Sequence, residues 1–126
     1  MIVGLGLDVI EVERIREVYE RHRERFPTRI LTEAERAYVL RHRDPVERLA
    51  GRWAAKEAAL KALGTGLADG LRWKEVEILP EPSGAPKLIL HGRALEVAQR
   101  LKANRYHVTI THSHSVAVAQ VILEQA

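Results

Sequence analysis

The alanine-rich stretch at residues 49–63 constrains the fold more than any other part of the chain. At about 100° per residue, its leucine and tryptophan side chains gather on one face of a helix. Lys56 and Glu57 project within that apolar face, and Lys61 lies at its margin. Charges turned toward a core cost several kcal/mol unless they are paired or bind a ligand. The segment therefore predicts a packed helix whose inward charges are either paired or used to bind a ligand.

Two interpretations of these charges remain open. The first is an internal salt bridge of Glu57 with Lys61 or with Lys56. The second is a carboxylate held for a metal ion, with lysines directed at phosphate. Asp8 is a second carboxylate at the end of an expected strand. Alone it predicts only a helix cap, but with Glu57 it gives two oxygen donors for one Mg²⁺, and Arg52, Lys56 and Lys61 supply cations for phosphate.

Capping signals predict where helices begin. Asp8 with Glu11 and Thr32 with Glu35 have the spacing of a capping box. Asp44 is expected to be the N-cap of the helix that contains residues 49–63. It is followed by proline, which is favoured at the first helical position.

Mixed strands and helices predict an α+β fold, an antiparallel sheet with helices packed on one side. The turn-rich residues 81–86 are expected to join two of the strands. Strands are expected at residues 2–7, 76–79, 88–90, 108–111 and 116–123, and helices at about 11–25, 32–42, 45–63 and 94–103.

Length and composition limit the class of protein. The 126 residues, 46 % of them hydrophobic, suit a single domain spanning residues 1–126. The absence of cysteine excludes disulfides, thiolate metal sites and a cysteine nucleophile. No apolar run approaches the roughly 20 residues of a membrane span, and residues 1–9 do not resemble a signal peptide. A cytoplasmic protein without membrane contact is expected.

An arginine-rich block follows the first strand. Such a block suits an acidic protein, a nucleic acid or phosphate, although a solvated helix face interleaved with glutamates explains the charge equally well. The block consists of Arg14, Arg16, Arg21, Arg23, Arg25 and Arg29.

Two further segments suggest anion binding. The sequence Gly64–Thr65–Gly66 follows the long helix, where glycine commonly ends a helix and backbone N–H groups also approach anions. His112 and His114 lie in the expected turn between the last two strands. Zinc would need a third ligand, and none is apparent. The hydroxyls and imidazoles of this turn are expected to contact a phosphate or nothing at all.

Five segments, in order along the chain, resemble the bacterial holo-acyl-carrier-protein synthase family of phosphopantetheinyl transferases. The central one, R-W-A-A-K-E-A-A-L-K-A-L-G-T-G, resembles the family's most diagnostic motif. His114 departs from the family pattern and receives no role. The matching segments are residues 4–15, 26–35, 52–66, 84–86 and 109–113.

The resemblance implies roles for individual residues. Asp8 and Glu57 would bind Mg²⁺, and Lys61 would contact the phosphates of coenzyme A. Arg14 and Arg21 would meet an acidic helix of the acyl carrier protein. The adenosine end and its 3′-phosphate would be bound by Arg52, His112 and Ser113, with Gly64, Thr65 and Gly66 lining the nucleotide pocket.

The implied reaction transfers 4′-phosphopantetheine from coenzyme A to a carrier serine, for fatty acid biosynthesis, and releases adenosine 3′,5′-bisphosphate. Glu57, or a water molecule placed by the metal, would accept the serine proton. The family also implies a homotrimer with sites at subunit interfaces. The competing hypotheses are a nucleic-acid-binding module, a Mg²⁺-dependent phosphotransferase acting on another nucleotide, and an inactive carrier-binding subunit; the resemblance disfavours all three, so no nucleic acid partner is expected.

Overall fold

A long strand opens the fold and brings Asp8 into the sheet. The computed structural model describes residues 1–68 and 70–126. Strand β1 (Ile2–Glu11) pairs antiparallel with the C-terminal strand, and the pairing extends to Glu11 opposite Val116. The prediction that Asp8 caps a helix was therefore wrong. The sheet ladder engages the backbone through Glu11, so helix α1 (Val12–Arg21) begins only afterwards.

Two antiparallel sheets are present, where the sequence predicted one. The larger has the order β1-β5-β4, with β4 at Arg105–His112 and β5 at Val116–Glu124. The smaller is a hairpin of β2 (Val76–Pro80) and β3 (Pro86–Leu90). The α+β class with antiparallel strands is confirmed.

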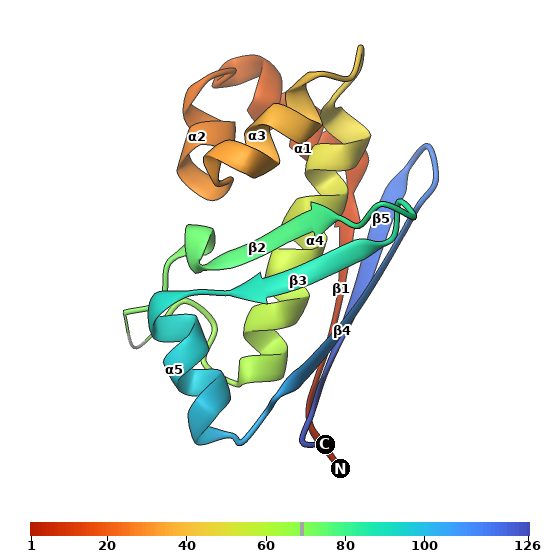
Figure 1. Ribbon diagram of the computed structural model, residues 1–126. Helices are drawn as coiled ribbons and strands as arrows, with labels where there is room; N and C mark the ends of the chain where they lie inside the picture. The colour runs from red at the N-terminus through yellow and green to blue at the C-terminus, as the bar shows by residue number, and fades with distance from the viewer. Residues whose placement is uncertain (69) are drawn as a thin grey trace.

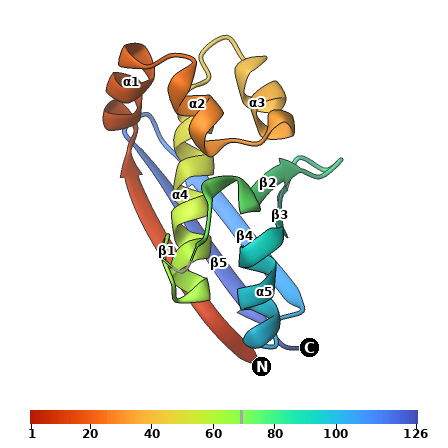
Figure 2. The ribbon, with the colours of Figure 1, turned by 90° about the vertical axis from the view of Figure 1, so that its left-hand side faces the viewer.

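The central helix α4 (Val46–Leu63) packs along one face of the larger sheet (Figures 1 and 2). The facing residues of β5 are small or β-branched, for example Ala117, Ala119 and Val121, and all are buried. Small side chains allow the helix to approach the strands closely. The helix ends at Gly64, whose left-handed backbone (φ +83°) favours glycine, as the sequence predicted.

The helices between β1 and α4 form a cap at one end of the molecule (Figure 1). Helix α1 ends at Arg21 and a short helix α2 (Arg25–Ile30) follows, where one helix to about residue 25 was expected. Thr32 and Glu35 form the predicted capping box of α3 (Glu33–Leu40). The start of α4 is displaced by one residue, because Pro45 rather than Asp44 is the N-cap.

The hairpin and the last helix cover the remaining side of α4. A 3₁₀ turn η1 (Trp73–Glu75) precedes β2, and α5 (Gly92–Arg100) follows β3. Buried side chains of α4, the hairpin, α5 and β5 form one core. Among the residues described, no helix is both long and apolar enough to cross a membrane.

Candidate active site

Asp8 and Lys61 contact each other between β1 and α4. The Lys61 ammonium donates to Asp8 Oδ1 at 3.0 Å and to the backbone carbonyl of Leu7 at 3.0 Å. Alternation along β1 directs Asp8 to the same face as Gly4 and Gly6, which is the face covered by α4. Only 15 % of the Asp8 side chain is exposed. Two elements far apart in sequence therefore assemble a charged centre.

Glu57 lies one helical turn before Lys61 and close enough to Asp8 to sense its charge. Burial raises the pKa of the Glu57 carboxyl above its ordinary value, and the negative charge of Asp8 adds to the rise. Lys61 acts in the opposite direction. Two neighbouring carboxylates with one ammonium leave negative charge that a further cation would neutralise.

The donor set of this centre fits a magnesium ion. Asp8 and Glu57 offer hard carboxylate oxygens, and Mg²⁺ usually takes one or two carboxylates together with substrate phosphates and water. The residues described contain no cluster of three or more histidine, aspartate or glutamate side chains placed to hold a metal. A metal at this place would thus share its coordination with substrate or water.

Lys56 does not face this centre. Its side chain is fully buried and donates to Glu35 Oε1 at 2.8 Å, to the Trp73 carbonyl at 3.1 Å and to the Val76 carbonyl. The other oxygen of Glu35 accepts the backbone N–H of Ile78. The interpretation of Lys56 as a phosphate ligand was therefore wrong. Lys56 does form an internal salt bridge, but its partner is Glu35 and not the predicted Glu57.

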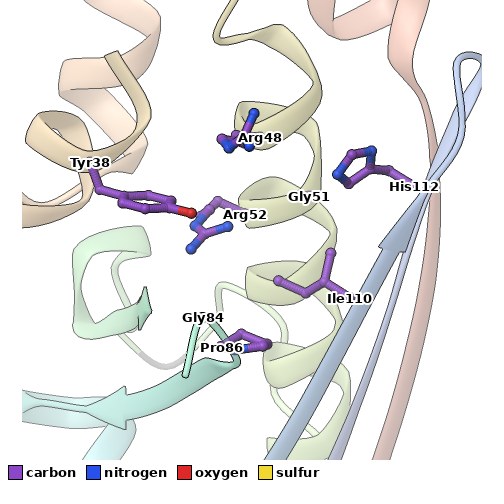
Figure 3. A pocket seen from close by; sticks show the side chains of 8 residues that line it. All are labelled: Tyr38, Arg48, Gly51, Arg52, Gly84, Pro86, Ile110 and His112. Carbon is purple, nitrogen blue, oxygen red and sulfur yellow. The ribbon is translucent and has the colours of Figure 1, made fainter. Parts of the chain in front are cut away.

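A second site lies on the other side of α4, around Arg52 (Figure 3). The cavity measures about 170 Å³ and lies between α3, α4, the β2–β3 turn and β4. Three of its lining side chains are basic: Arg48, Arg52 and His112. The lining residues are Tyr38, Arg48, Gly51, Arg52, Gly84, Pro86, Ile110 and His112.

Arg52 is unusual because the residue is buried (7 % exposed), yet its guanidinium lacks a partner at Nε. Burial lowers the pKa of Arg52, and Tyr38 and Glu35 oppose that effect. The guanidinium carbon lies 4.6 Å from the centre of the Tyr38 ring. A buried donor without a partner is costly, so an anion that accepts from Arg52 would be stabilised here.

The end of β4 brings His112 into this cavity, whereas Ser113, which follows it, is not part of the lining. His112 Nδ1 lies 3.5 Å from Glu47 Oε2, in the first turn of α4. Ser113 Oγ instead accepts the backbone N–H groups of Ser115 and Val116, both at 3.3 Å. In this chain Ser113 shapes the turn and does not line the cavity.

Gly64, Thr65 and Gly66 lie at the opposite end of α4 from the cavity. Twelve residues separate Arg52 from Gly64, which is roughly 18 Å along a helix. The lining of the Arg52 cavity does not include these residues. The structure thus separates two groups that the sequence assigned to one nucleotide pocket.

The arginines of α1 point in different directions. Arg14 borders a groove of about 530 Å³ that Glu57 also lines. Arg21 follows seven residues later, close to two helical turns, and therefore lies on the same face. Arg16 instead pairs with Asp44 at 3.0 Å, beside the loop before α4. Only part of the arginine block therefore shares a surface with the charged centre.

The sequence profile of the 4′-phosphopantetheinyl transferase superfamily matches residues 4–119, which include Asp8, Arg52, Glu57, Lys61 and His112. The chain belongs to this superfamily. The family predicted from the five motifs is thereby confirmed.

Similar members of the superfamily share almost the entire chain. The holo-[acyl-carrier-protein] synthase of Solidesulfovibrio magneticus is 51 % identical over 124 residues, which cover 98 % of this chain and 99 % of the relative. The synthase of Koribacter versatilis is 47 % identical over 124 residues with the same coverage.

Solved transferase structures have the same fold. The holo-(acyl-carrier-protein) synthase of Bacillus anthracis in complex with CoA (3′,5′-ADP) is 38 % identical, with a TM-score of 0.83 over 100 % of this chain and 99 % of that one. The Helicobacter pylori synthase in complex with coenzyme A is 27 % identical, with a TM-score of 0.84 over 95 % of this chain and 99 % of that one.

Sequence reasoning on this transferase missed several residues around Arg52. Arg48 lies one helical turn before Arg52, so helical spacing would have indicated it. Glu47 approaches His112, and Tyr38 approaches Arg52, only because separate elements pack together. No local pattern in the sequence signals these last two contacts.

Proposed function

We propose that this chain is a holo-acyl-carrier-protein synthase, which transfers 4′-phosphopantetheine from coenzyme A to a serine of an acyl carrier protein. The superfamily and the names of the similar synthases support this proposal. The observation that carries it is the convergence of Asp8, Glu57 and Lys61 at one place between β1 and α4. These residue types suit transfer of a phosphate group.

In the proposed reaction, the oxygen of the carrier serine attacks the β-phosphate of coenzyme A. A bond forms between that oxygen and phosphorus, the pyrophosphate linkage breaks, and adenosine 3′,5′-bisphosphate leaves. Bound Mg²⁺ would supply Lewis-acid polarisation of the phosphate oxygens and a template for the substrates. Asp8 and Glu57 would hold this ion.

Charge neutralisation and proton transfer would depend on side chains of this chain. Lys61 would neutralise negative charge on the transferring and leaving phosphates, as a positioned cation does in phosphoryl transfer. The serine proton would pass to Glu57 or to a water molecule held beside it.

The Arg52 cavity would bind the 3′-phosphate of coenzyme A. Arg48, Arg52 and His112 provide cationic or donating groups around it, and Arg52 Nε has no partner. A phosphate would satisfy that donor with a charge-assisted hydrogen bond. The coenzyme A complexes of similar synthases support coenzyme A as the donor substrate.

The carrier protein would dock on α1. Arg14 and Arg21 are exposed on one face of this helix, with the exposed Val18 between them. Cations around an apolar side chain suit an acidic helix, because opposite charges guide association and the apolar contact adds affinity. The groove that contains both Arg14 and Glu57 would admit the serine.

We further propose that the enzyme is a homotrimer. The uncovered face of β1 presents Leu5, Leu7 and Val9, which are 60 %, 55 % and 60 % exposed. Such an apolar row suits a subunit interface. Glu57 and Arg52 are five residues apart on α4 and so project about 140° from each other. A neighbouring subunit that brings its own Arg52 cavity toward Glu57 would join the two halves of one coenzyme A site.

The decisive experiment is the intact mass of an apo acyl carrier protein after incubation with this protein, coenzyme A and Mg²⁺. A gain of one phosphopantetheine group, absent with EDTA, is expected. No gain with several apo carriers and folded protein would refute the proposed activity. Sedimentation of the protein tests the trimer separately, and a monomer at the assay concentration would refute it.

A further inference from the structure

Tyr38 differs from the other described residues that line the Arg52 cavity because it comes from α3. Its ring lies beside the Arg52 guanidinium, whose carbon is 4.6 Å from the ring centre. Figure 3 shows the ring extending from α3 toward Arg52 across the cavity. Apart from the imidazole of His112, no other aromatic ring lines this cavity among the residues described.

This contact lowers the free-energy cost of burying the Arg52 guanidinium. In the described part of the chain, Arg52 forms no ion pair, and its Nε has no partner. Arg48 lies one turn away and adds like charge. A cation over an aromatic ring is attracted by the ring's electron density, and the attraction grows when water is excluded. Tyr38 therefore offsets part of the cost of burying Arg52 through its ring and its hydroxyl, and Arg52 Nε still has no partner.

We propose that Tyr38 is a positioning residue that holds Arg52 ready for the 3′-phosphate of coenzyme A. An arginine paired with a carboxylate would have to exchange that partner for the phosphate. The ring of Tyr38 fixes the guanidinium, and Nε keeps its donor available for the phosphate. Preorganised donors bind more tightly because less ordering remains to be done on binding. The proposal rests on the function proposed above and names a further determinant of its donor specificity.

The expected consequence is a selective loss of affinity for coenzyme A. Tyr38→Leu removes the ring but keeps an apolar side chain, so the KM for coenzyme A should rise about threefold to 30-fold. The KM for 3′-dephospho-coenzyme A should change less than twofold, because that donor lacks the 3′-phosphate. The kcat with saturating donor should also be nearly unchanged. A merely structural role would alter both donors alike.

Two variants serve as controls. Tyr38→Phe retains the ring and should restore nearly the wild-type preference for coenzyme A over the dephospho donor. Arg41 lies 5.0 Å from the same ring but does not line the cavity. Arg41→Gln should therefore leave both KM values unchanged. Thermal unfolding of each variant shows whether the fold is retained.

The measurement is the steady-state KM of the wild type and the three variants with each donor, at saturating Mg²⁺ and apo carrier. A Tyr38→Leu variant with the wild-type ratio of the two KM values would overturn the proposal, and so would failure of Tyr38→Phe to restore that ratio. Calorimetric binding of adenosine 3′,5′-bisphosphate and of AMP provides the same comparison without turnover. If the wild type modifies no carrier, the proposed function fails, while this binding comparison still tests Tyr38.

Discussion

Gly6 on β1 lies directly against the backbone carbonyl of Ala58 on α4. A Cβ at this position would overlap the Ala58 carbonyl oxygen and lie 2.7 Å from its carbonyl carbon. Glycine is therefore the residue that permits this distance between strand and helix. Asp8, two residues farther along the same face of β1, depends on this close approach to reach Lys61.

Substitution of Gly6 by alanine should separate the strand from the helix. We expect a loss of about 1–3 kcal/mol in the free energy of unfolding, as for other overpacked sites. Activity should also fall, and more Mg²⁺ should be needed for half-maximal rate, because Asp8 moves away from Glu57 and Lys61. Urea unfolding and Mg²⁺ titration check both effects. If Gly6→Ala had the wild-type stability and the wild-type Mg²⁺ requirement, the helix would have moved away from the strand without loss of free energy, which would contradict the expected role of Gly6.

The buried pair of Lys56 and Glu35 should contribute mainly to stability. Lys56→Met leaves the Glu35 carboxylate buried without its cation, which should cost about 3–5 kcal/mol of unfolding free energy. The double variant Lys56→Met with Glu35→Gln should recover part of that loss, because no uncompensated charge remains. Lys61→Met, at an exposed side chain, is the stability control. Equal losses in the single and double variants would contradict the charge argument.

Much of the fold was predictable from local signals. The capping box at Thr32 and Glu35 and the left-handed glycine at the end of α4 each depend on a few neighbouring residues. Asp8 had an equally good local signal, and there the prediction failed. The hydrogen bonds that extend β1 come from β5, more than a hundred residues away, and no capping pattern contains that information.

The candidate site, like the fold, was predictable from local signals but not in its contacts between separate elements. The composition of α4 indicated special roles for Lys56 and Glu57 because both fall within an apolar face. It did not indicate that only one of the two would find a buried partner, since Glu35 comes from another helix. The contact of Tyr38 with Arg52 likewise arises from packing of α3 on α4. Partners across elements are fixed by tertiary structure and not by helical spacing.

Glu77 should make stability depend on acid pH. Burial acts to raise the pKa of its carboxyl, but hydrogen bonds from Thr32, at 2.6 Å, and His91 lower it below the ordinary value. Because the folded-state pKa is lower than the unfolded one, Glu77 stabilises the fold above its ordinary pKa of about 4.3. That stabilisation is lost as the pH falls through the folded-state value.

The variant Glu77→Gln should therefore be less stable than the wild type at pH 6, and the difference should shrink toward pH 3. Urea unfolding across this range measures it. Glu81→Gln, at an exposed position in the hairpin turn, is the matched control. A difference between Glu77→Gln and the wild type that does not vary with pH would mean that shape, and not charge, explains the effect.

The carboxylates proposed as Mg²⁺ ligands should be indispensable for turnover. Asp8→Ala or Glu57→Ala should abolish phosphopantetheine transfer, because each removes one of the two oxygen donors at the centre. Circular dichroism checks that each variant is folded. Near-normal activity of either variant at limiting Mg²⁺ would eliminate that residue as a ligand.

Arg14 should act on the carrier protein rather than on coenzyme A. Arg14→Glu reverses a charge on the face of α1 that we propose meets an acidic helix, so the KM for the carrier should rise about tenfold or more at low salt. The KM for coenzyme A should change much less. Arg16→Gln is the matched control on the same helix, since Arg16 already pairs with Asp44. Because added salt screens exposed charges, the difference between Arg14→Glu and the wild type should narrow as ionic strength increases. An unchanged carrier KM in Arg14→Glu would remove α1 as the docking helix.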